Sequence, residues 1–487
     1  MTTIVNTKLG ENRGKKRIWL EGQKLAREGY EPGMRFDVAL KDAEINVEIC
    51  QEGRYSVSKR ERNGRIYPII DLNLAELAKI FDGVEMLRVA IKAGKIVITA
   101  HHQELRVKER EERLASKLSC GQSLDVCSLF HGGGLLDLAL HQGLKQAGLK
   151  SRLAVAVEWE GKYLDASLTN NPELWDDESI VIESPVQSVN LAKNGLQVDL
   201  LVGGIPCTGS SLSGRSKNHL KHAESHVDAG AMFYSFLQFV EILNPSIVLI
   251  ENVEEYQHTA SMEVIRSVLS TLGYQLHEKV LNSNEFGTLE RRKRLCVVGL
   301  SKGIKTFDFD TLQPLKVKEE SINDILEDVP LDSDRWKSFD YLAEKEKRDI
   351  AAGKGFRRQL LDGSEPLCGT IGKSYAKCRS TEPFVKHPSD DSLSRLFTPL
   401  EHCRLKGAPE KVIANLSDTT AHEVLGQAIA FPVFKSVGLC IGQGLLRHSE
   451  QIKQPANLVN TTENCDVDPV SLSLFETEQS GQVSVIH

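Results

Sequence analysis

Cys207 stands where a chain could present a nucleophile. It follows the apolar run 198–201 and lies in a turn, Val-Gly-Gly-Ile-Pro-Cys-Thr-Gly-Ser-Ser, that covers residues 202–211. Glycines let the backbone bend out of a sheet, and Pro206 restricts φ immediately before the thiol. We therefore expect the thiol at the carboxyl edge of a sheet, where α/β proteins bind ligands. The alternative is a small structural thiol at a strand end, since free cysteines are usually buried and inert.

Two further groups could act with this thiol. Glu251 ends the apolar run 247–250, and four consecutive basic residues, 291–294, precede the apolar run 295–300. If the strands that end near Val202 and Ile250 share a sheet, the thiol and the carboxylate open onto one edge. A thiol with a pKa of about 8.5 needs a base or a positive neighbour to react at neutral pH. The basic run is either a clamp for an anion or carbonyl, or a solvated turn.

A second constellation is typical of a nucleotide-like ligand. The apolar run 124–130 leads into Gly132-Gly133-Gly134, and Glu158-Trp159 follows the next apolar run, 153–157. Glycines in a strand-to-helix turn let a ligand approach the backbone, and an acid after the next strand can accept ribose hydroxyls. Trp159 offers a face for stacking on an adenine. The alternatives are packing glycines, a helix cap and a core aromatic, and the loop lacks the G-x-G-x-x-G of dinucleotide sites.

The elements that must position these residues alternate between apolar strands and helical segments. This alternation predicts an α/β fold with a doubly wound, largely parallel sheet and helices on both faces. The predicted strands cover residues 124–130, 153–157, 180–182, 200–202, 247–250 and 295–300.

The flanking regions differ in character. Residues 1–103 hold short alternating runs, including a hairpin over 87–99, which predict a small β-rich domain. Within it, residues 17–22 and 29–34 weakly resemble swapped-hairpin domains of the AbrB or SymE type, many of which bind DNA or dimerise; an accessory β-barrel is the alternative. Residues 104–120 predict a charged, solvated linker helix. The polar tail, 449–487, is predicted to be disordered.

Composition limits the class of protein and the kinds of partner. The chain has 487 residues, 40% of them hydrophobic, and its first residues lack the apolar core of a secretory signal, which favours a cytoplasmic, non-membrane protein. The ten cysteines include no CxxC pair, so neither a zinc site nor a disulfide framework is indicated. The net charge of -7 means that a nucleic-acid partner would need a local basic surface.

Taken in chain order, these motifs and others resemble those of the cytosine-C5 methyltransferase family over residues 122–445. The resemblance implies a Rossmann-like, S-adenosylmethionine-dependent methyltransferase fold. Each motif is short, and seven of them occur in sequence. They are Phe130-x-Gly132-x-Gly134, Glu158-Trp159, Gly203-Gly204-x-Pro206-Cys207, Glu251-Asn252-Val253, Glu290-x-Arg292-x-Arg294, Arg395 to Gly407, and Gly426-Gln427-Ala428-Ile429 with Pro432-Val433.

The resemblance implies a reaction. Cys207 would add to C6 of a cytosine, C5 would take the methyl group of S-adenosylmethionine, and Glu251 would hold or protonate N3. Arg292 and Arg294 would stabilise charge at O2 and position the backbone around the thiol. Because C6 is unreachable inside a duplex, the base must be flipped out. The implied cofactor-binding residues are Phe130, Gly132, Gly134, Glu158, Trp159, Pro206, Gln427 and Ile429.

Several positions depart from the family pattern and suggest a divergent branch. Thr208 and Glu290 stand where Gln is usual, Ser210 where Phe is usual, and Gln427 where Asn is usual. His131 and Leu135 also differ, and Ser184 stands where an adenine-contacting Asp is common.

Residues 303–394, called the target segment below, lie where the family keeps its target-recognition domain, between the catalytic core (121–302) and its return (395–448). DNA contacts are predicted at Arg357, Arg358, Lys373, Tyr375 and Lys377. The leading hypothesis is a phage or bacterial enzyme that methylates double-stranded DNA, as in restriction-modification. A homodimer formed through the N-terminal domain is one option for its oligomeric state. The alternatives are a transfer-RNA cytosine methyltransferase and a non-catalytic DNA-binding regulator.

Overall fold

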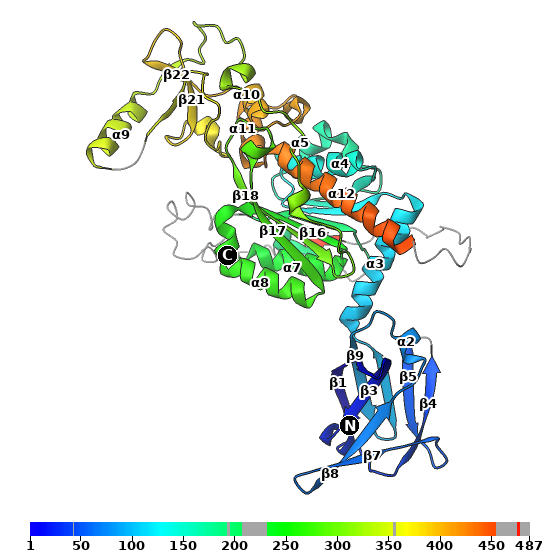
Figure 1. Ribbon diagram of the computed structural model, residues 1–487. Coiled ribbons are helices and arrows are strands. Elements are labelled where there is room, and N and C mark those ends of the chain that lie inside the picture. The colour runs from blue at the N-terminus through cyan, green and yellow to red at the C-terminus, as the bar shows by residue number, and fades with distance from the viewer. Residues whose placement is uncertain (42, 192–194, 207–230, 354–356, 454–474, 478–487) are drawn as a thin grey trace, which may run out of the picture. The chain divides into compact units, whose positions relative to one another are not determined.

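The computed structural model describes residues 1–41, 43–191, 195–206, 231–353, 357–453 and 475–477 (Figure 1). The chain divides into two compact units, Met1–Glu109 and Arg110–His487. The predicted nucleophile Cys207, with Thr208 and Ser210, lies outside the described residues.

The first unit is β-rich, as predicted. A six-stranded antiparallel sheet has the order β1-β9-β10-β5-β4-β6, and a four-stranded sheet has the order β2-β3-β8-β7. Their bounds are β1 Thr2–Lys8, β2 Gly10–Asn12, β3 Lys15–Glu21, β4 Arg35–Lys41, β5 Glu44–Ile49, β6 Tyr55–Ser56, β7 Ser58–Arg62, β8 Arg65–Leu72, β9 Met86–Lys92 and β10 Lys95–Ala100, with short helices α1 Gln23–Ala26 and α2 Leu77–Ile80. Buried Ile18, Ile70, Val89 and Ile98 belong to one core drawn from both sheets. The predicted hairpin is β9–β10, with Gly94 at φ 74° in its turn.

Helix α3 (His102–Cys120) covers the predicted linker, but its second half is not a solvated linker. Arg110 is buried: it donates to Ser301 Oγ and to two carbonyls, and its guanidinium lies 3.8 Å from the centroid of the Tyr274 ring. Lys117 forms ion pairs with Asp125 and Asp199 at 2.5 and 2.6 Å. The charge pattern was misread because these basic residues bind carboxylates and carbonyls of the second unit instead of water.

The second unit is built on a seven-stranded sheet with the order β13-β12-β11-β15-β16-β18-β17. The strands are β11 Leu124–Leu129, β12 Ser151–Glu158, β13 Ile180–Glu183, β15 Leu200–Gly204, β16 Ile247–Val253, β17 Tyr274–Asn282 and β18 Lys293–Ser301. The β13 to β16 run is parallel, and β18 is antiparallel to both of its neighbours. All six predicted strands are confirmed, and β17 was missed.

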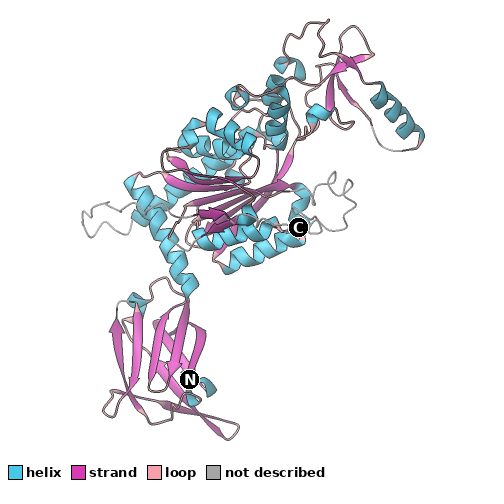
Figure 2. Ribbon diagram, turned by 180° about the vertical axis from the view of Figure 1, so that it is seen from behind, coloured by secondary structure: helices cyan, strands magenta, loops and turns pink. Residues whose placement is uncertain are grey.

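Helices cover both faces of this sheet (Figures 1 and 2). On one face, α4 (Leu135–Gln146) and α12 (Phe431–Lys453) contribute Leu138 and Val437 to one core cluster. On the other, α7 (Met232–Leu243) and α8 (Ala260–Thr271) contribute Phe236 and Ile265 to a second. The doubly wound fold is therefore confirmed. A Cβ at Gly143 would lie 2.2 Å from the Lys435 carbonyl oxygen, so a glycine is what lets α4 and α12 pack closely.

The target segment contains most of a separate four-stranded sheet, β19-β22-β21-β20. Its elements are β19 Lys337–Ser338, α9 Asp340–Ala351, β20 Gln359–Leu361, β21 Pro383–Lys386 and β22 Leu393–Arg395. A small core of its own includes Ile322, Ile371 and Phe397. The chain then returns to the catalytic core through α10 (Pro399–Leu405) and α11 (Asp418–Gln427).

Most of the predicted polar tail lies outside the described residues. Of the tail, β23 (Phe475–Thr477) pairs antiparallel with β14 (Val189–Leu191). Within the described part of the chain, no single helix combines the length and apolar composition of a membrane span, and α11 with α12 meets that test only as a pair bent by 47°.

Candidate active site

The site begins at the carboxyl ends of two neighbouring parallel strands, β15 and β16. Gly204 pairs in register with Glu251, so the turn that leads to Cys207 leaves the sheet beside this carboxylate. Asn252 is buried, and its Nδ2 donates to the Ile205 carbonyl oxygen at 3.1 Å. This hydrogen bond fixes the backbone immediately before Pro206. The sequence prediction that both strands open onto one edge is thus confirmed.

Glu251 has a basic partner at this edge. Arg294 Nε lies 2.9 Å from Glu251 Oε1, with the two side chains 16% and 14% exposed. Arg294 stands near the start of β18, opposite Val253 of β16, so the antiparallel pairing of these strands brings the two groups together. The pair is held by the sheet, and its partial exposure leaves it accessible to a ligand.

Arg292 lies elsewhere. It is buried, and its guanidinium contacts the Glu290 carboxylate at 3.4 Å and the carbonyl oxygens of Ile371 and Gly426 at 3.3 Å. The expectation that both arginines act at the reacting base therefore fits Arg294, which lies at the strand edge beside Glu251. Arg292 instead joins the target segment to the core.

Four described cysteines of the second unit are buried thiols that are unsuited to nucleophilic attack. Cys296 pairs with Glu251 across β16 and β18, yet burial, reinforced by the Glu251 charge, raises the pKa of its thiol. Burial likewise raises the pKa of Cys127, Cys368 and Cys403. Thiols with raised pKa values are poor nucleophiles at neutral pH.

The predicted cofactor edge is assembled around Glu158. Its Oε1 accepts from the amides of Trp159 and Glu160 at 3.0 Å, and its Oε2 accepts from the Gly132 amide at 2.7 Å. Because each carboxylate oxygen can accept about two hydrogen bonds, Oε2 retains one acceptor site for a hydroxyl. Trp159 beside it is 65% exposed, and its ring is open to stacking. Ser184 lies next to this edge, where its amide donates to the Glu158 carbonyl oxygen.

The glycine turn forms a close-fitting cradle. Gly132 and Gly134 have φ angles of 58° and 74°, and Phe130 also has a positive φ of 58°. A Cβ at Gly132 would lie 3.4 Å from Gln427 Nε2, and that buried amide nitrogen has no hydrogen-bond partner within the described residues. A free acceptor site, an exposed ring and an unpaired buried donor around a glycine turn fit a nucleoside ligand such as S-adenosylmethionine. Ile429 lies in the adjacent core, and Pro206 is half-buried.

His131 holds this turn from inside and was noted in the sequence only as a departure. Its Nδ1 lies 3.0 Å from Ser128 Oγ and 2.9 Å from Asp137 Oδ2, and its Nε2 lies 2.8 Å from Ser167 Oγ. The ring also packs edge-on against Trp175. His131 and Asn252 are positioning residues that sequence reasoning missed, because their partners lie on other elements.

Replacing Gly134 with alanine is expected to destabilise the protein and weaken cofactor binding. A Cβ there would lie 2.4 Å from Ser167 Oγ and 2.9 Å from His131 Nε2. Such overpacking costs about 1–3 kcal/mol of unfolding free energy. Gly148→Ala is the matched control, because Gly148 also has a positive φ but nothing lies within 4 Å of its Cβ position. Denaturant unfolding and cofactor titration distinguish the two; equal losses in both variants would attribute the effect to backbone strain alone.

The structure contradicts one of the predicted DNA contacts and leaves the others as predictions. Tyr375 is wrong as a DNA contact: it is fully buried, its hydroxyl donates to the Pro383 carbonyl oxygen at 2.7 Å, and burial raises its pKa. Arg358 is half-buried, with its amide and guanidinium bound to Glu346 and Ser394. The remaining three, Arg357, Lys373 and Lys377, are exposed. Lys373 Nζ lies 4.6 Å from the centroid of the Tyr163 ring, on α5 (Gly161–Asn170) of the core.

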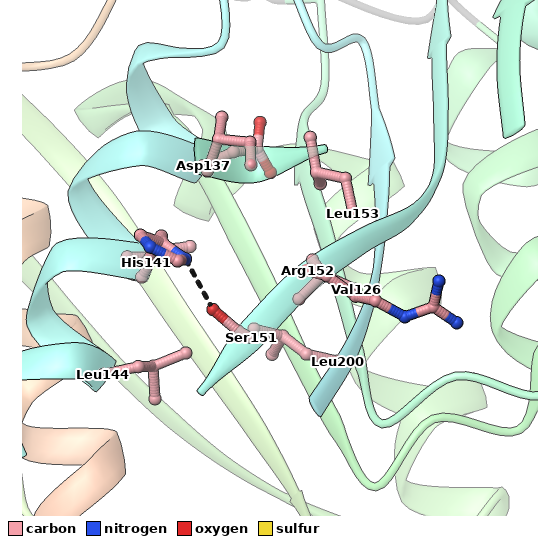
Figure 3. A pocket seen from close by; sticks show the side chains of 10 residues that line it. Val126, Asp137, His141, Leu144, Ser151, Arg152, Leu153 and Leu200 are labelled. Carbon is pink, nitrogen blue, oxygen red and sulfur yellow. Dashed lines mark hydrogen bonds between the residues drawn. The ribbon is translucent and has the colours of Figure 1, made fainter. Parts of the chain in front are cut away.

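A cavity between β11, β12 and α4 is separate from both edges (Figure 3). His141 Nδ1 and Ser151 Oγ, 3.1 Å apart, lie on its wall. Its volume of about 10 Å³ is near the least that a single water molecule needs, so it is no ligand site.

The chain is similar in sequence to a known family of proteins. The profile of a family described as C-5 cytosine-specific DNA methylase matches residues 124–443. Type II methyltransferase M.SsoII of Shigella sonnei is 29% identical over 250 residues, which are 49% of this chain and 62% of that protein. Type II methyltransferase M.Bsp6I of Bacillus sp. (strain RFL6) is 24% identical over 335 residues, covering 66% of this chain and 100% of that protein.

Among solved structures, the S. pombe Dnmt2 methyltransferase superposes with a TM-score of 0.49 at 17% identity, covering 69% of this chain and 100% of that one. The matches to M.SsoII and to M1.ScrFI of Lactococcus lactis subsp. cremoris span 62% and 61% of the lengths of those proteins.

Proposed function

The chain belongs to the C-5 cytosine-specific DNA methylase family, and on that premise we propose that it transfers a methyl group from S-adenosylmethionine to C5 of a cytosine in double-stranded DNA. The observation that carries the proposal is the Glu251–Arg294 pair at the strand edge from which the Cys207 turn departs. A carboxyl group and a guanidinium held together there can contact the edge of a pyrimidine that carries N3 and O2, while a thiol attacks C6 from one face of the ring.

Cys207, Glu251 and Arg294 each act on a different atom of the base. The Cys207 thiolate forms a bond to C6 as the C5–C6 double bond opens, and Glu251 supplies or holds the proton at N3. Arg294 balances the negative charge that develops at O2. Methyl transfer to C5 leaves S-adenosylhomocysteine; the C5 proton is then lost to a base from the solvent, which re-forms the double bond and expels the thiolate. Each residue acts on the base, which leaves the duplex at a cost of a few kcal/mol.

The cofactor, when bound, supplies an electrophilic methyl group. Glu158 would accept the ribose hydroxyls through its remaining acceptor site, Trp159 would stack on the adenine, and Gln427 Nε2 would donate to the ligand. The amides already bound to Glu158 keep its carboxylate in one orientation, so little side-chain entropy is lost on binding.

Labelled S-adenosylmethionine tests the proposal directly. We expect incorporation into duplex DNA and little into transfer RNA or unrelated single strands. Incorporation into transfer RNA alone would overturn the choice of substrate. No incorporation into any substrate, although the cofactor binds, would favour the non-catalytic regulator.

For the target segment, we propose DNA contacts through Arg357, Lys373 and Lys377, whose side chains are exposed. Because phosphate contacts depend on charge and release counterions, neutralising them should weaken binding similarly across sequences and reduce its salt dependence.

The N-terminal unit is proposed to add DNA affinity. Residues 1–109 contain 20 Lys and Arg against 16 Asp and Glu, although the whole chain is acidic. On the outer face of β3, β7 and β8, three arginines, Arg17, Arg60 and Arg62, flank half-buried Trp19. Asp71 and Glu21 pair with them, so their net contribution to binding is modest.

Deleting residues 1–103 is therefore expected to weaken DNA binding by a few fold and flatten its salt dependence, while cofactor affinity stays unchanged. Fluorescence anisotropy at several salt concentrations measures this, with sedimentation to detect any change of oligomeric state. Unchanged DNA affinity together with unchanged mass would reduce the unit to an accessory domain.

A further inference from the structure

Three charged side chains are buried where the target segment meets the catalytic core. Glu290 and Lys406 are fully buried, and Arg292 is 4% exposed. Lys406 Nζ lies 2.7 Å from Glu290 Oε2, and Arg292 Nη1 lies 3.4 Å from Glu290 Oε1. Burying charges is costly unless they are paired, so this junction cluster (Glu290, Arg292 and Lys406) needs an explanation beyond packing.

The cluster binds backbone from the target segment. The Ile371 amide donates to Glu290 Oε1 at 2.9 Å, and Arg292 donates to the Ile371 carbonyl oxygen at 3.3 Å. Both peptide groups of one residue are therefore held by one ion-pair network. Beside it, Arg291 N donates to the Cys368 carbonyl oxygen, and Thr370 Oγ1 donates to the Arg291 carbonyl oxygen.

The same cluster reaches the cofactor edge. Arg292 Nη2 donates to the carbonyl oxygen of Gly426, the residue before Gln427. A Cβ at Gly426 would lie 2.3 Å from the Gly372 carbonyl oxygen, so the target segment packs directly on the end of α11. Two residues beyond Arg292, Arg294 pairs with Glu251. One cluster thus contacts or adjoins all three parts of the proposed site.

We propose that the buried Glu290–Lys406 ion pair, acting through Arg292, is a positioning element. It holds Ile371 of the target segment in a fixed position relative to the Glu251–Arg294 pair and to the cofactor edge at Gln427. The inference rests on the proposed function. The pair requires a carboxylate at 290, because an amide could not balance the charge of Lys406.

The electrostatics agree with this geometry. Burial, and then repulsion from Arg292, lowers the pKa of Lys406 to about 7, while Glu290 opposes the shift. Burial alone would raise the pKa of Glu290, but Lys406 and Arg292 bring it below its ordinary value. The neighbouring His402 stays neutral, because burial and Lys406 lower its pKa well below the usual range. The Glu290 carboxylate is therefore ionised at neutral pH, and its charge favours the protonated form of Lys406 against the effect of burial.

The test compares Glu290→Gln, Lys406→Gln and the double variant with a matched control, Glu401→Gln. Glu401 is also fully buried and ion-paired, with Arg395 at 2.6 Å, but the bonds described for that pair reach neither Ile371 nor Gly426. The measurements are melting temperature, kcat at saturating DNA and cofactor, and amide hydrogen exchange of peptides covering 366–373 and 424–428.

Each single variant at the junction should speed exchange in both peptides and lower kcat by about 100-fold, the effect of misplacing reacting groups by about 1 Å. In the double variant two amides can bond to each other, so kcat should recover at least about tenfold over either single variant, as for residues that act as a unit. Glu401→Gln should leave exchange in both peptides unchanged.

Additive losses in the double variant would overturn the proposal, as would a control that lowers kcat as much at an equal loss of melting temperature. If the parent protein transfers no methyl group, the proposed function fails. Hydrogen exchange still tests the role of the junction cluster in that case, because the measurement needs no activity. Unchanged exchange in Glu290→Gln would overturn the proposed role.

Discussion

Replacing Glu251 with glutamine is expected to lower kcat for methyl transfer by about 100-fold or more, the range found when a positioned acid or base is removed. Glutamine preserves the shape of the side chain but cannot supply a proton to N3 of the base. It also leaves Arg294 without its anionic partner, which lies 2.9 Å away. Because the pair is partly exposed, the fold should survive the change.

Glu254→Gln is the matched control. Glu254 lies at the same end of β16 and pairs with Lys293 at 3.6 Å, but both side chains are about half exposed. An exposed ion pair contributes about 0–1 kcal/mol, so kcat and stability should change little. Single-turnover kinetics with both variants measure the chemical step; a Glu251→Gln rate within threefold of the parent would remove Glu251 from the mechanism.

The central fold was predictable because its strands are nearly continuous apolar runs. Strands buried on both faces, such as β11 and β15, carry that signal in any arrangement. Of the two edge strands, β13 was predicted from its apolar run 180–182, whereas β17 was missed because polar residues interrupt its run and only Tyr274 and Leu281 are buried. Apolar runs report burial, and the sequence of β17 contains no such run.

The site was predictable where strand order alone brings residues together. Glu251 and Arg294 meet because β16 and β18 are neighbours in the sheet. Both residues also belong to motifs that can be recognised in the sequence. The role of Tyr375 was not predictable: an aromatic residue among basic ones suggests a DNA contact, yet its hydroxyl bonds to Pro383 inside the target segment's core. The Glu290–Lys406 pair was equally hidden, because its two members lie on segments far apart in the chain.

Replacing Cys207 with serine is expected to reduce methyl transfer by about three orders of magnitude or more, the scale of losing an essential nucleophile. The hydroxyl is a far weaker nucleophile than the thiolate, and it attacks only when a base removes its proton. The described segment before Cys207 ends at Pro206, and the Asn252 bond to the Ile205 carbonyl oxygen does not involve the thiol, so the variant should fold and bind cofactor as the parent does.

Cys120→Ser controls for general thiol loss, because Cys120 is an exposed cysteine at the end of α3. Labelled-methyl incorporation and cofactor titration are measured on both variants. Activity of Cys207→Ser within tenfold of the parent would mean that no covalent bond to C6 is required. Asn252→Ala should then separate the two parts of the argument: if the thiol acts from a fixed turn, losing this hydrogen bond lowers kcat while the reactivity of Cys207 toward a small alkylating agent persists.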